Sequence, residues 1–460
     1  MRSATLLVLA LVALPVATRA RTPVPPAPAM PLIQSIANDV RADALRATIN
    51  RLVGFGTRHT MSDTQSNTRG IGAARRWVKD RFGEINRDCK DCLRIETPSL
   101  SVTGERITQP TAIVDVLAIQ RGTDDPERVI VISGHIDSRV RDVMDAKSDA
   151  PGADDDGSGI AAVLEAARVL SKHKFHATLV YAVLSGEEQG LYGGKLLAQY
   201  AHDHHWSVEA DLNNDIIGNT LGTNGVSDAT HVRVFSEGTR STETPEQATR
   251  RRYNGGEVDS PSRNLARFIN GLADTYLRDF HVRMVYRTDR YSRGGDQVPM
   301  LAMGYPAVRF TEAIENYTRE HQDVRSENDV HYGDVLDAVD FAYLAQVARL
   351  NIVTMAALAM APAPPAQVKT EGAVSMDTTV SWSAVPAAAG YRVWWRDTTA
   401  PNWGDSRSVA DATSLLLKDV NIDDWFFGVA SVSSDGYESP VEFPGPAGAF
   451  VAVPDVAEGK

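Results

Sequence analysis

The sequence predicts an α/β protein with a mostly parallel, mixed sheet flanked by helices, followed by a small all-β sandwich. The runs at 129–133 and 177–184 are apolar and rich in β-branched residues without polar alternation, which is typical of buried strands. Between them, residues 157–172 place their apolar side chains on one helical face. This strand–helix–strand order predicts parallel strands joined by a crossover. Short strands separated by turn residues after residue 366 predict the sandwich.

The composition is that of a globular protein with an acidic surface. The chain has 460 residues, of which 43% are hydrophobic, and this is enough for full cores in two or three domains. Its formal net charge is -12. Proteins that bind nucleic acid need clustered Lys and Arg to displace counterions from phosphates, so we expect no nucleic-acid partner. Small or peptidic substrates fit this composition better.

Residues 1–20 have the features of a secretory signal peptide. Arg2 gives a basic start, residues 6–14 form an apolar run too short to span a bilayer, and small residues follow at 17–20. A retained membrane anchor is the alternative. No other stretch of membrane length is purely apolar. We therefore expect a protein without stable membrane insertion, secreted or periplasmic after signal-peptide cleavage.

Residues 31–360 are predicted to form one large domain. Its first part, 33–82, has apolar residues at helical spacing and predicts two helices separated by the turn sequence GFGTRHT. The two cysteines of the chain, Cys89 and Cys92, predict a local disulfide in an oxidising compartment. A redox-active dithiol is the alternative, although the surrounding thioredoxin-like pattern is missing. A zinc ribbon would need a second cysteine pair, which the sequence lacks.

Helices and strands alternate through the rest of this domain. A strand is predicted over 111–120, and a turn follows over 124–128. After the 177–184 strand, the pattern predicts helices over 191–201, 261–278 and 335–360, and strands over 210–217, 231–235, 282–286 and 307–311.

The sequence APAPPA at 361–366 predicts a domain boundary, because a Pro-rich segment cannot continue a helix and is stiff enough to act as a spacer. Residues 367–455 are then predicted to form a β-sandwich whose core is separate from that of the large domain. The placement of Trp382, Tyr391 and Tyr437 resembles a fibronectin type III module. Such a module is a candidate for binding protein or polysaccharide surfaces.

Polar clusters follow the apolar runs of the crossover unit. His135 and Asp137 come after one strand, an acidic run at 154–156 precedes the helix, and Glu187 and Glu188 follow the next strand. The carboxyl ends of parallel strands meet at one edge of the sheet, where ligands bind. Like charges at this density are tolerated most easily when a cation neutralises them. A mixed His and carboxylate set favours zinc, or less often manganese or cobalt, over calcium.

Five motifs in this order resemble those of the M28 family of two-zinc exopeptidases, in particular its secreted bacterial aminopeptidases. They are GHIDS, GADDDGSG, GEEQG, NNDIIGN and EHQDVRSEND, and they extend over residues 129–329. The resemblance implies the two-zinc exopeptidase fold and two Zn2+ ions per chain. It implies a set of five metal ligands, namely His135, Asp155, Glu188, Asp215 and His321.

The resemblance also implies which metal each of these residues would bind. His135 and Asp215 would bind one metal, Glu188 and His321 the other, and Asp155 would bridge both. Glu187 would be the general base. In the family the peptide bond after the bridging Asp is commonly cis.

Two further assignments come from the residues around this set. From chemistry alone, any carboxylate of the run 154–156 could face the metals, and the G-S-G register favours Asp155. Asp137 is expected to accept the second ring N–H of His135 and to fix its tautomer.

The sequence departs from the family pattern at two places. Many relatives place an aromatic hydroxyl beside the last His to stabilise the oxyanion, but here Glu320 precedes His321 and the nearest candidate is Tyr317. The S-D-H segment of the family appears as GGDQ at 294–297, which keeps Asp296 and replaces the following His by Gln297.

The sequence therefore predicts a secreted zinc metalloaminopeptidase that acts on peptide substrates. A carboxylate-rich pocket attracts the free amino end of a peptide more readily than a terminal carboxylate. Arg139, Arg293 and Arg309 leave a carboxypeptidase open as an alternative. A glutaminyl cyclase on the same fold and a non-catalytic peptide-binding protein are also compatible with the fold. The complete ligand set and Glu187 argue against a protein without catalytic activity.

Overall fold

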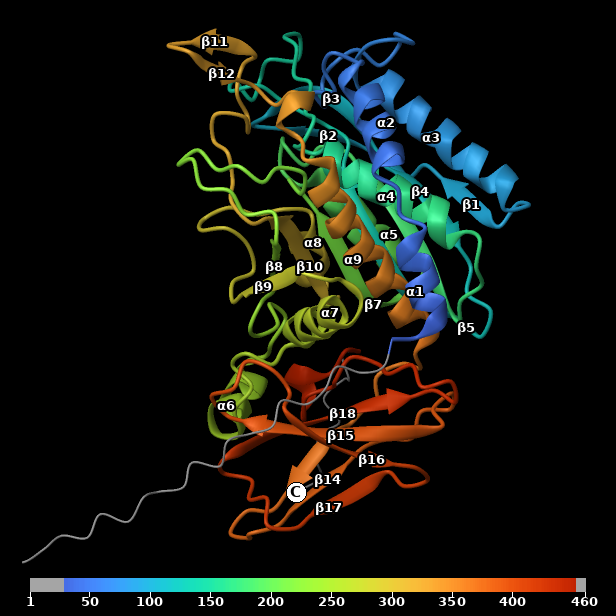
Figure 1. Ribbon diagram of the computed structural model, residues 1–460, viewed down its shortest axis with the longest axis vertical. Coiled ribbons are helices and arrows are strands. Elements are labelled where there is room, and N and C mark those ends of the chain that lie inside the picture. Colours follow the sequence, from blue (N-terminus) through green and yellow to red (C-terminus); the bar gives the residue numbers. More distant parts are fainter. Residues whose placement is uncertain (1–28, 452–460) are drawn as a thin grey trace, which may run out of the picture.

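The computed structural model describes residues 29–451 and is built around one eight-stranded sheet (Figure 1). The central pairs β5–β6, β5–β7 and β7–β10 are parallel, as is the edge pair β8–β9. The other pairs are antiparallel. In spatial order the strands are β1 (Leu93–Glu96), β4 (Val116–Gln120), β6 (Ala177–Leu184), β5 (Asp125–His135), β7 (Ser207–Asn214), β10 (Ala307–Glu312), β8 (His231–Phe235) and β9 (His281–Val285).

Helices cover both faces of this sheet. Because side chains alternate along a strand, Ile130 and Ile132 of β5 point into one core while Val129 and Val131 point into the other. The larger core is closed by α1 (Pro31–Asn38), α2 (Ala42–Val53), α3 (Gly70–Asp88), α4 (Gly157–Leu170), α7 (Pro261–Tyr276) and α9 (Phe341–Met360). The smaller core is closed by α5 (Tyr192–Asp203) and α8 (Gln297–Ala302). Burial on both faces explains the continuous apolar runs of β5 and β6, and it confirms the predicted fold class.

Several elements differ from the sequence prediction. Within residues 29–88, three helices form and not two. The strand expected over 111–120 is divided at Asp115, whose buried carboxylate accepts the backbone N–H of Ser185. The part before Asp115 belongs to a separate hairpin of β2 (Ser99–Gly104) and β3 (Ile107–Val114). A helix α6 (Pro245–Asn254), a hairpin of β11 (Arg325–Glu327) and β12 (Val330–Tyr332) and the 3-10 turn η1 (Leu336–Ala338) were not predicted.

The helix α9 is apolar on nearly all sides. Asp340 caps its first turn by accepting the backbone N–H groups of Ala342 and Tyr343, so the helix begins at 341 and not at 335. Within residues 29–451 it is the only helix long and apolar enough to cross a membrane, and 83% of its most apolar window is buried inside the protein. Such burial is typical of the core helix of a large domain.

The C-terminal residues form two three-stranded antiparallel sheets around a core of their own, which includes Val380, Trp382, Tyr391 and Phe427. One sheet contains β13 (Lys369–Glu371), β14 (Thr378–Ser381) and β17 (Ser414–Leu417). The other contains β16 (Asp405–Val409), β15 (Gly390–Asp397) and β18 (Trp425–Val432), and the 3-10 turn η2 (Pro446–Gly448) follows. The resemblance of this sandwich to a fibronectin type III module stays a prediction.

The sandwich packs directly on the large domain (Figure 1). Tyr437 and Phe450 belong to the larger α/β core. The sequence predicts two separate cores, but these two residues join the sandwich to the core of the large domain. The buried carboxylate of Asp259, just before α7, accepts two hydrogen bonds from Arg396 of the sandwich, at 2.7 and 2.8 Å, and one from Arg267 at 2.8 Å. Nothing in the composition of the Pro-rich segment indicates these contacts, because they are made by residues far from it.

This buried ion pair predicts that the two domains unfold together. In Asp259→Asn, Arg396 loses its charged partner inside the protein, which costs about 3–5 kcal/mol. The matched control is Glu96→Gln, which breaks an exposed pair with Arg94 and should cost at most about 1 kcal/mol. Thermal unfolding followed by circular dichroism measures both. Separate unfolding transitions of the two domains in the parent protein, or an unchanged unfolding temperature in Asp259→Asn, would show that the contact does not couple the domains.

Candidate metal centre

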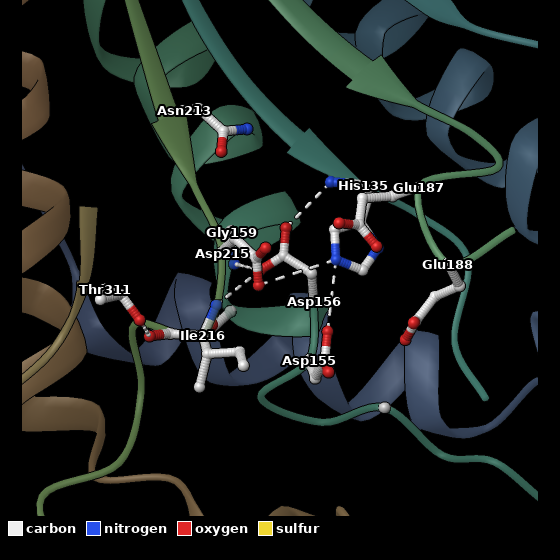
Figure 2. A network of polar contacts seen from close by, with 12 residues as sticks. His135, Asp155, Asp156, Gly159, Glu187, Glu188, Asn213, Asp215, Ile216 and Thr311 are labelled. Carbon is white, nitrogen blue, oxygen red and sulfur yellow. Dashed lines mark hydrogen bonds and ion pairs between the residues drawn. The ribbon is translucent and has the colours of Figure 1, made fainter. Parts of the chain in front are cut away.

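The five residues assigned as metal ligands lie together at the carboxyl edge of the sheet. His135 is the last residue of β5, Asp215 directly follows β7, and Glu188 lies in the turn after β6. Asp155 lies just before α4, and His321 lies in the segment between β10 and β11. Figure 2 shows several of these side chains pointing into one space from different segments. Residues separated by up to 186 positions thus meet because parallel strands end at the same edge.

Their ligand atoms form two groups that share Asp155. In the first group, His135 Nε2 lies 3.2 Å from Asp155 Oδ1 and 3.8 Å from Asp215 Oδ1. In the second group, His321 Nε2 lies 2.8 Å from Asp155 Oδ2 and 3.1 Å from Glu188 Oε1. Each oxygen of Asp155 therefore faces a different group, which is the arrangement of a bridging ligand.

The donor atoms fit a pair of cations. Asp155 Oδ2 and Glu188 Oε1 are buried, and within the described residues neither accepts a hydrogen bond of good geometry, although His321 Nε2 is nearby. A buried acceptor without a partner costs about 1–3 kcal/mol, so these oxygens favour a cation. Each group offers imidazole nitrogen and carboxylate oxygen, which suits zinc and related transition metals.

Only one carboxylate of the acidic run is directed at the ligand groups. Asp154 Oδ1 accepts the backbone N–H of Gly218 at 2.7 Å. Asp156 accepts the N–H groups of His135 and Gly159, both at 2.9 Å. The peptide bond between Asp155 and Asp156 is cis. The carboxylate of Asp155 thus points toward the two ligand groups, while those of its two neighbours accept backbone N–H groups.

The carboxylate of Asp156 is hydrogen-bonded to three segments that carry candidate metal ligands (Figure 2). Besides His135 and Gly159, its carboxylate accepts the backbone N–H of Ile216, which follows Asp215, at 3.4 Å. Burial raises the pKa of Asp156 well above its ordinary value, while the nearby His135 lowers this pKa. This carboxylate holds the ends of β5 and β7 against the start of α4.

Asp334 also binds the backbone of a ligand-bearing segment, and the sequence analysis did not predict it. Its carboxylate accepts the backbone N–H of Asp154 at 2.9 and 3.0 Å and that of Asp155 at 2.7 Å. No local motif marks it, because it lies 179 residues from Asp155 in the chain.

Asp137 does not act through the atoms that the sequence analysis expected. His135 Nδ1 lies 3.1 Å from the backbone carbonyl of Asp137 and 3.8 Å from its carboxylate Oδ1. The backbone carbonyl therefore orients the imidazole. The carboxylate accepts the backbone N–H groups of Gly186, Glu187 and Glu188, at 2.8, 3.3 and 3.1 Å. It shapes the turn that carries both glutamates.

Glu187 lies next to the ligand groups on the turn that Asp137 holds. Burial raises the pKa of its carboxyl well above the ordinary value, and the nearby His135 opposes this shift. The role of Glu187 as the general base stays a prediction.

Two arginines that the sequence analysis considered as substrate ligands contact the candidate metal ligands instead. Arg139 Nε lies 2.6 Å from Glu188 Oε2, and its Nη2 lies 2.5 Å from His321 Nδ1. Arg309 Nη1 lies 2.7 Å from Asp215 Oδ2. Burial would raise the pKa of Asp215, but the Arg309 guanidinium and His135 hold this pKa well below its usual range.

The remaining residues singled out by the sequence analysis belong to neither ligand group. Tyr317 is 59% exposed, and its backbone N–H donates to Thr223 Oγ1, so its role as an oxyanion stabiliser stays a prediction. Gln297, in place of the family His, donates to Asp289 Oδ2 at 2.6 Å. Cys89 and Cys92 are joined by a disulfide in the turn between α3 and β1.

A family model, described as peptidase family M28, matches residues 115–349 of this chain and covers all five candidate ligands. The chain belongs to peptidase family M28. A probable zinc metalloprotease from Leptosphaeria maculans is 42% identical over 418 residues, which cover 90% of this chain and 97% of that protein. Another from Pyricularia oryzae is 41% identical and covers 90% of this chain and 84% of that protein. Both organisms are fungi, so the resemblance to the bacterial group stays a prediction.

The M28 fold is also found in a solved structure of low sequence identity. The LapA aminopeptidase of Legionella pneumophila is 20% identical, and the match covers 70% of this chain and 71% of that chain with a TM-score of 0.50. At this identity the similarity establishes the fold alone.

The contacts of Asp156 predict that it controls metal affinity without being a ligand. In Asp156→Asn, one oxygen becomes an amide donor, so the side chain can accept either the N–H of His135 at the end of β5 or those of Gly159 and Ile216, but not both. We expect zinc affinity to fall by about 10–100-fold, as for other residues that orient metal ligands. Zinc titration against a competing chelator measures this, with the exposed Asp124→Asn as control. Unchanged affinity would show that the ligands hold their positions without Asp156.

Proposed function

We propose that this protein is a two-zinc metallopeptidase that hydrolyses peptide bonds at the free amino end of peptides. The observation that carries the proposal is the pair of ligand groups sharing Asp155, with the Glu187 carboxylate beside them. The names of the fungal relatives support zinc as the metal. His135 and Asp215 would hold one ion, Glu188 and His321 the other, and Asp155 both.

The residues of this chain suit amide hydrolysis. Zinc, when bound here, would polarise the peptide carbonyl and acidify the attacking water. The Glu187 carboxylate accepts the proton of that water and delivers it to the leaving amine. Asp137 supports this transfer because it fixes the backbone of Glu187 relative to His135. The buried position of the ligands limits competing solvent around the scissile bond.

The arginines near the ligand groups are paired with acidic side chains, which favours binding of the amino end of a substrate peptide over its carboxyl end. Arg139 contacts Glu188, Arg309 contacts Asp215, and Arg293 contacts Glu315 and Glu320. A terminal carboxylate would need a guanidinium or another donor that is not already engaged by an acidic side chain. This charge arrangement supports an aminopeptidase over a carboxypeptidase.

Two accompanying proposals concern parts of the chain outside the catalytic site. The signal-peptide features of residues 1–20, which lie outside the described residues, support export of the protein. The C-terminal sandwich, of fibronectin type III type, is proposed to bind protein or polysaccharide surfaces. A test for binding is co-sedimentation of the whole protein with insoluble polysaccharides.

Glu187→Gln should separate proton transfer from metal binding. The substitution removes the proton acceptor and leaves every proposed ligand in place, so we expect kcat to fall by about 10²–10⁴-fold. Zinc content, measured by mass spectrometry of the purified protein, should stay near two per chain. Glu188→Gln is the matched control, and it should lose zinc. A near-normal kcat in Glu187→Gln would mean that another residue is the base.

The choice of peptide end is tested with blocked substrates. We expect N-acetylation of a short peptide to abolish turnover, because the ammonium group is lost, and C-amidation to have little effect. Liquid chromatography of the products under zinc-replete conditions measures both. Loss of turnover on amidation alone would identify a carboxypeptidase. Release of pyroglutamyl products from N-terminal glutamine would identify a glutaminyl cyclase.

A further inference from the structure

Each terminal carboxylate of the two ligand groups has one oxygen near a histidine and the other on an arginine. Asp215 Oδ1 lies 3.8 Å from His135 Nε2, while Oδ2 lies 2.7 Å from Arg309 Nη1. Glu188 Oε1 lies 3.1 Å from His321 Nε2, while Oε2 lies 2.6 Å from Arg139 Nε. The same division of oxygens occurs in both groups, although the two arginines come from unrelated segments.

This division limits how many donor atoms each group can offer. With one oxygen of the terminal carboxylate engaged by an arginine, each group would offer a metal three protein donors: a histidine nitrogen, one oxygen of Asp155 and one oxygen of Asp215 or Glu188. Catalytic zinc sites have three protein ligands and an open fourth position, whereas structural sites have four. A carboxylate that bound through both oxygens would supply the fourth donor and close the position.

We propose that Arg139 and Arg309 are positioning residues that hold Glu188 and Asp215 to one donor oxygen each and so keep one coordination position of each metal open. The inference rests on the proposed two-zinc site and adds to it the reason for two arginines beside metal ligands. Positive groups at this place repel a divalent cation, so they are unsuited to tighten metal binding. Their effect is on the geometry of the carboxylates.

The two arginines differ in accessibility. Arg309 is fully buried, and it also contacts Asp289 at 3.4 Å. The side chain of Arg139 is 17% exposed, and it contacts both Glu188 and His321. Arg139 is therefore the better residue to substitute, because solvent can enter the space that its side chain leaves.

The test uses Arg139→Met and Arg309→Met in the full-length protein, with cobalt replacing zinc. Visible absorption of Co2+ weakens as its coordination number rises. We expect both variants to absorb more weakly than the parent, because the freed oxygen becomes a fourth protein donor. Zinc affinity, measured by chelator competition, should be equal to or tighter than that of the parent. We expect kcat to fall by at least about tenfold, because the open position receives the substrate oxygen.

A matched control is Arg233→Met. The Arg233 side chain is 18% exposed and pairs at 2.5 Å with Glu315, which belongs to neither ligand group, so the cobalt spectrum should not change. If Arg309→Met does not fold, Arg139→Met alone decides the question.

Two results would overturn the inference. A loss of zinc affinity of about 10–100-fold with an unchanged cobalt spectrum would mean that the arginines only orient the carboxylates. An unchanged spectrum with unchanged affinity would mean that the second oxygen stays unbound without them. Failure of the parent protein to bind two metals would instead contradict the proposed function, and the parent measurement separates these cases.

Discussion

The architecture of this protein depends on the burial of several carboxylates at one edge of its sheet. Asp137, Asp154, Asp155, Asp156 and Glu188 are all buried there. Like charges in a medium of low polarity repel one another strongly, so each must be protonated, hydrogen-bonded or paired with a cation. Backbone N–H groups satisfy Asp137, Asp154 and Asp156, and an arginine satisfies half of Glu188. Among these carboxylates, the oxygens that accept no hydrogen bond within the described residues are Asp155 Oδ2 and Glu188 Oε1, and both face His321.

These carboxylates also explain how separate loops keep a common geometry. Asp137 holds the turn after β6, Asp156 holds the ends of β5 and β7, and Asp334 holds the segment before α4. Each uses both carboxylate oxygens on backbone groups of a different segment, so loops that would otherwise move independently are joined to one another. The charged groups of the site need hydrogen bonds, and the strands bring suitable backbone donors to the same edge.

The sequence predicts much of this from local patterns. β5, α4 and β6 are evident because both strands are continuously apolar and the helix has a 3.6-residue period. The five candidate ligands come from the resemblance of the motifs to those of the M28 family. What it could not predict depends on contacts between distant residues. The expected strand over 111–120 is divided because Asp115 meets Ser185, Asp334 reaches the acidic run across the fold, and Arg139 and Arg309 pair with ligands and not with substrate. Tyr437 and Phe450 lie in the predicted sandwich segment, and their place in the larger α/β core depends on how the two domains pack.

The strand β5 has a different neighbour at each of its ends. Near its beginning, Arg128 donates to the carbonyls of Leu358 and Ala361, where the chain leaves for the sandwich, whereas His135 ends the strand at the ligand groups. Seven residues of extended chain separate the two points by about 23 Å. The sandwich and the catalytic edge therefore face opposite directions. A protein molecule attached to a surface through its sandwich would present its catalytic edge to the surrounding medium, open to peptides that diffuse freely.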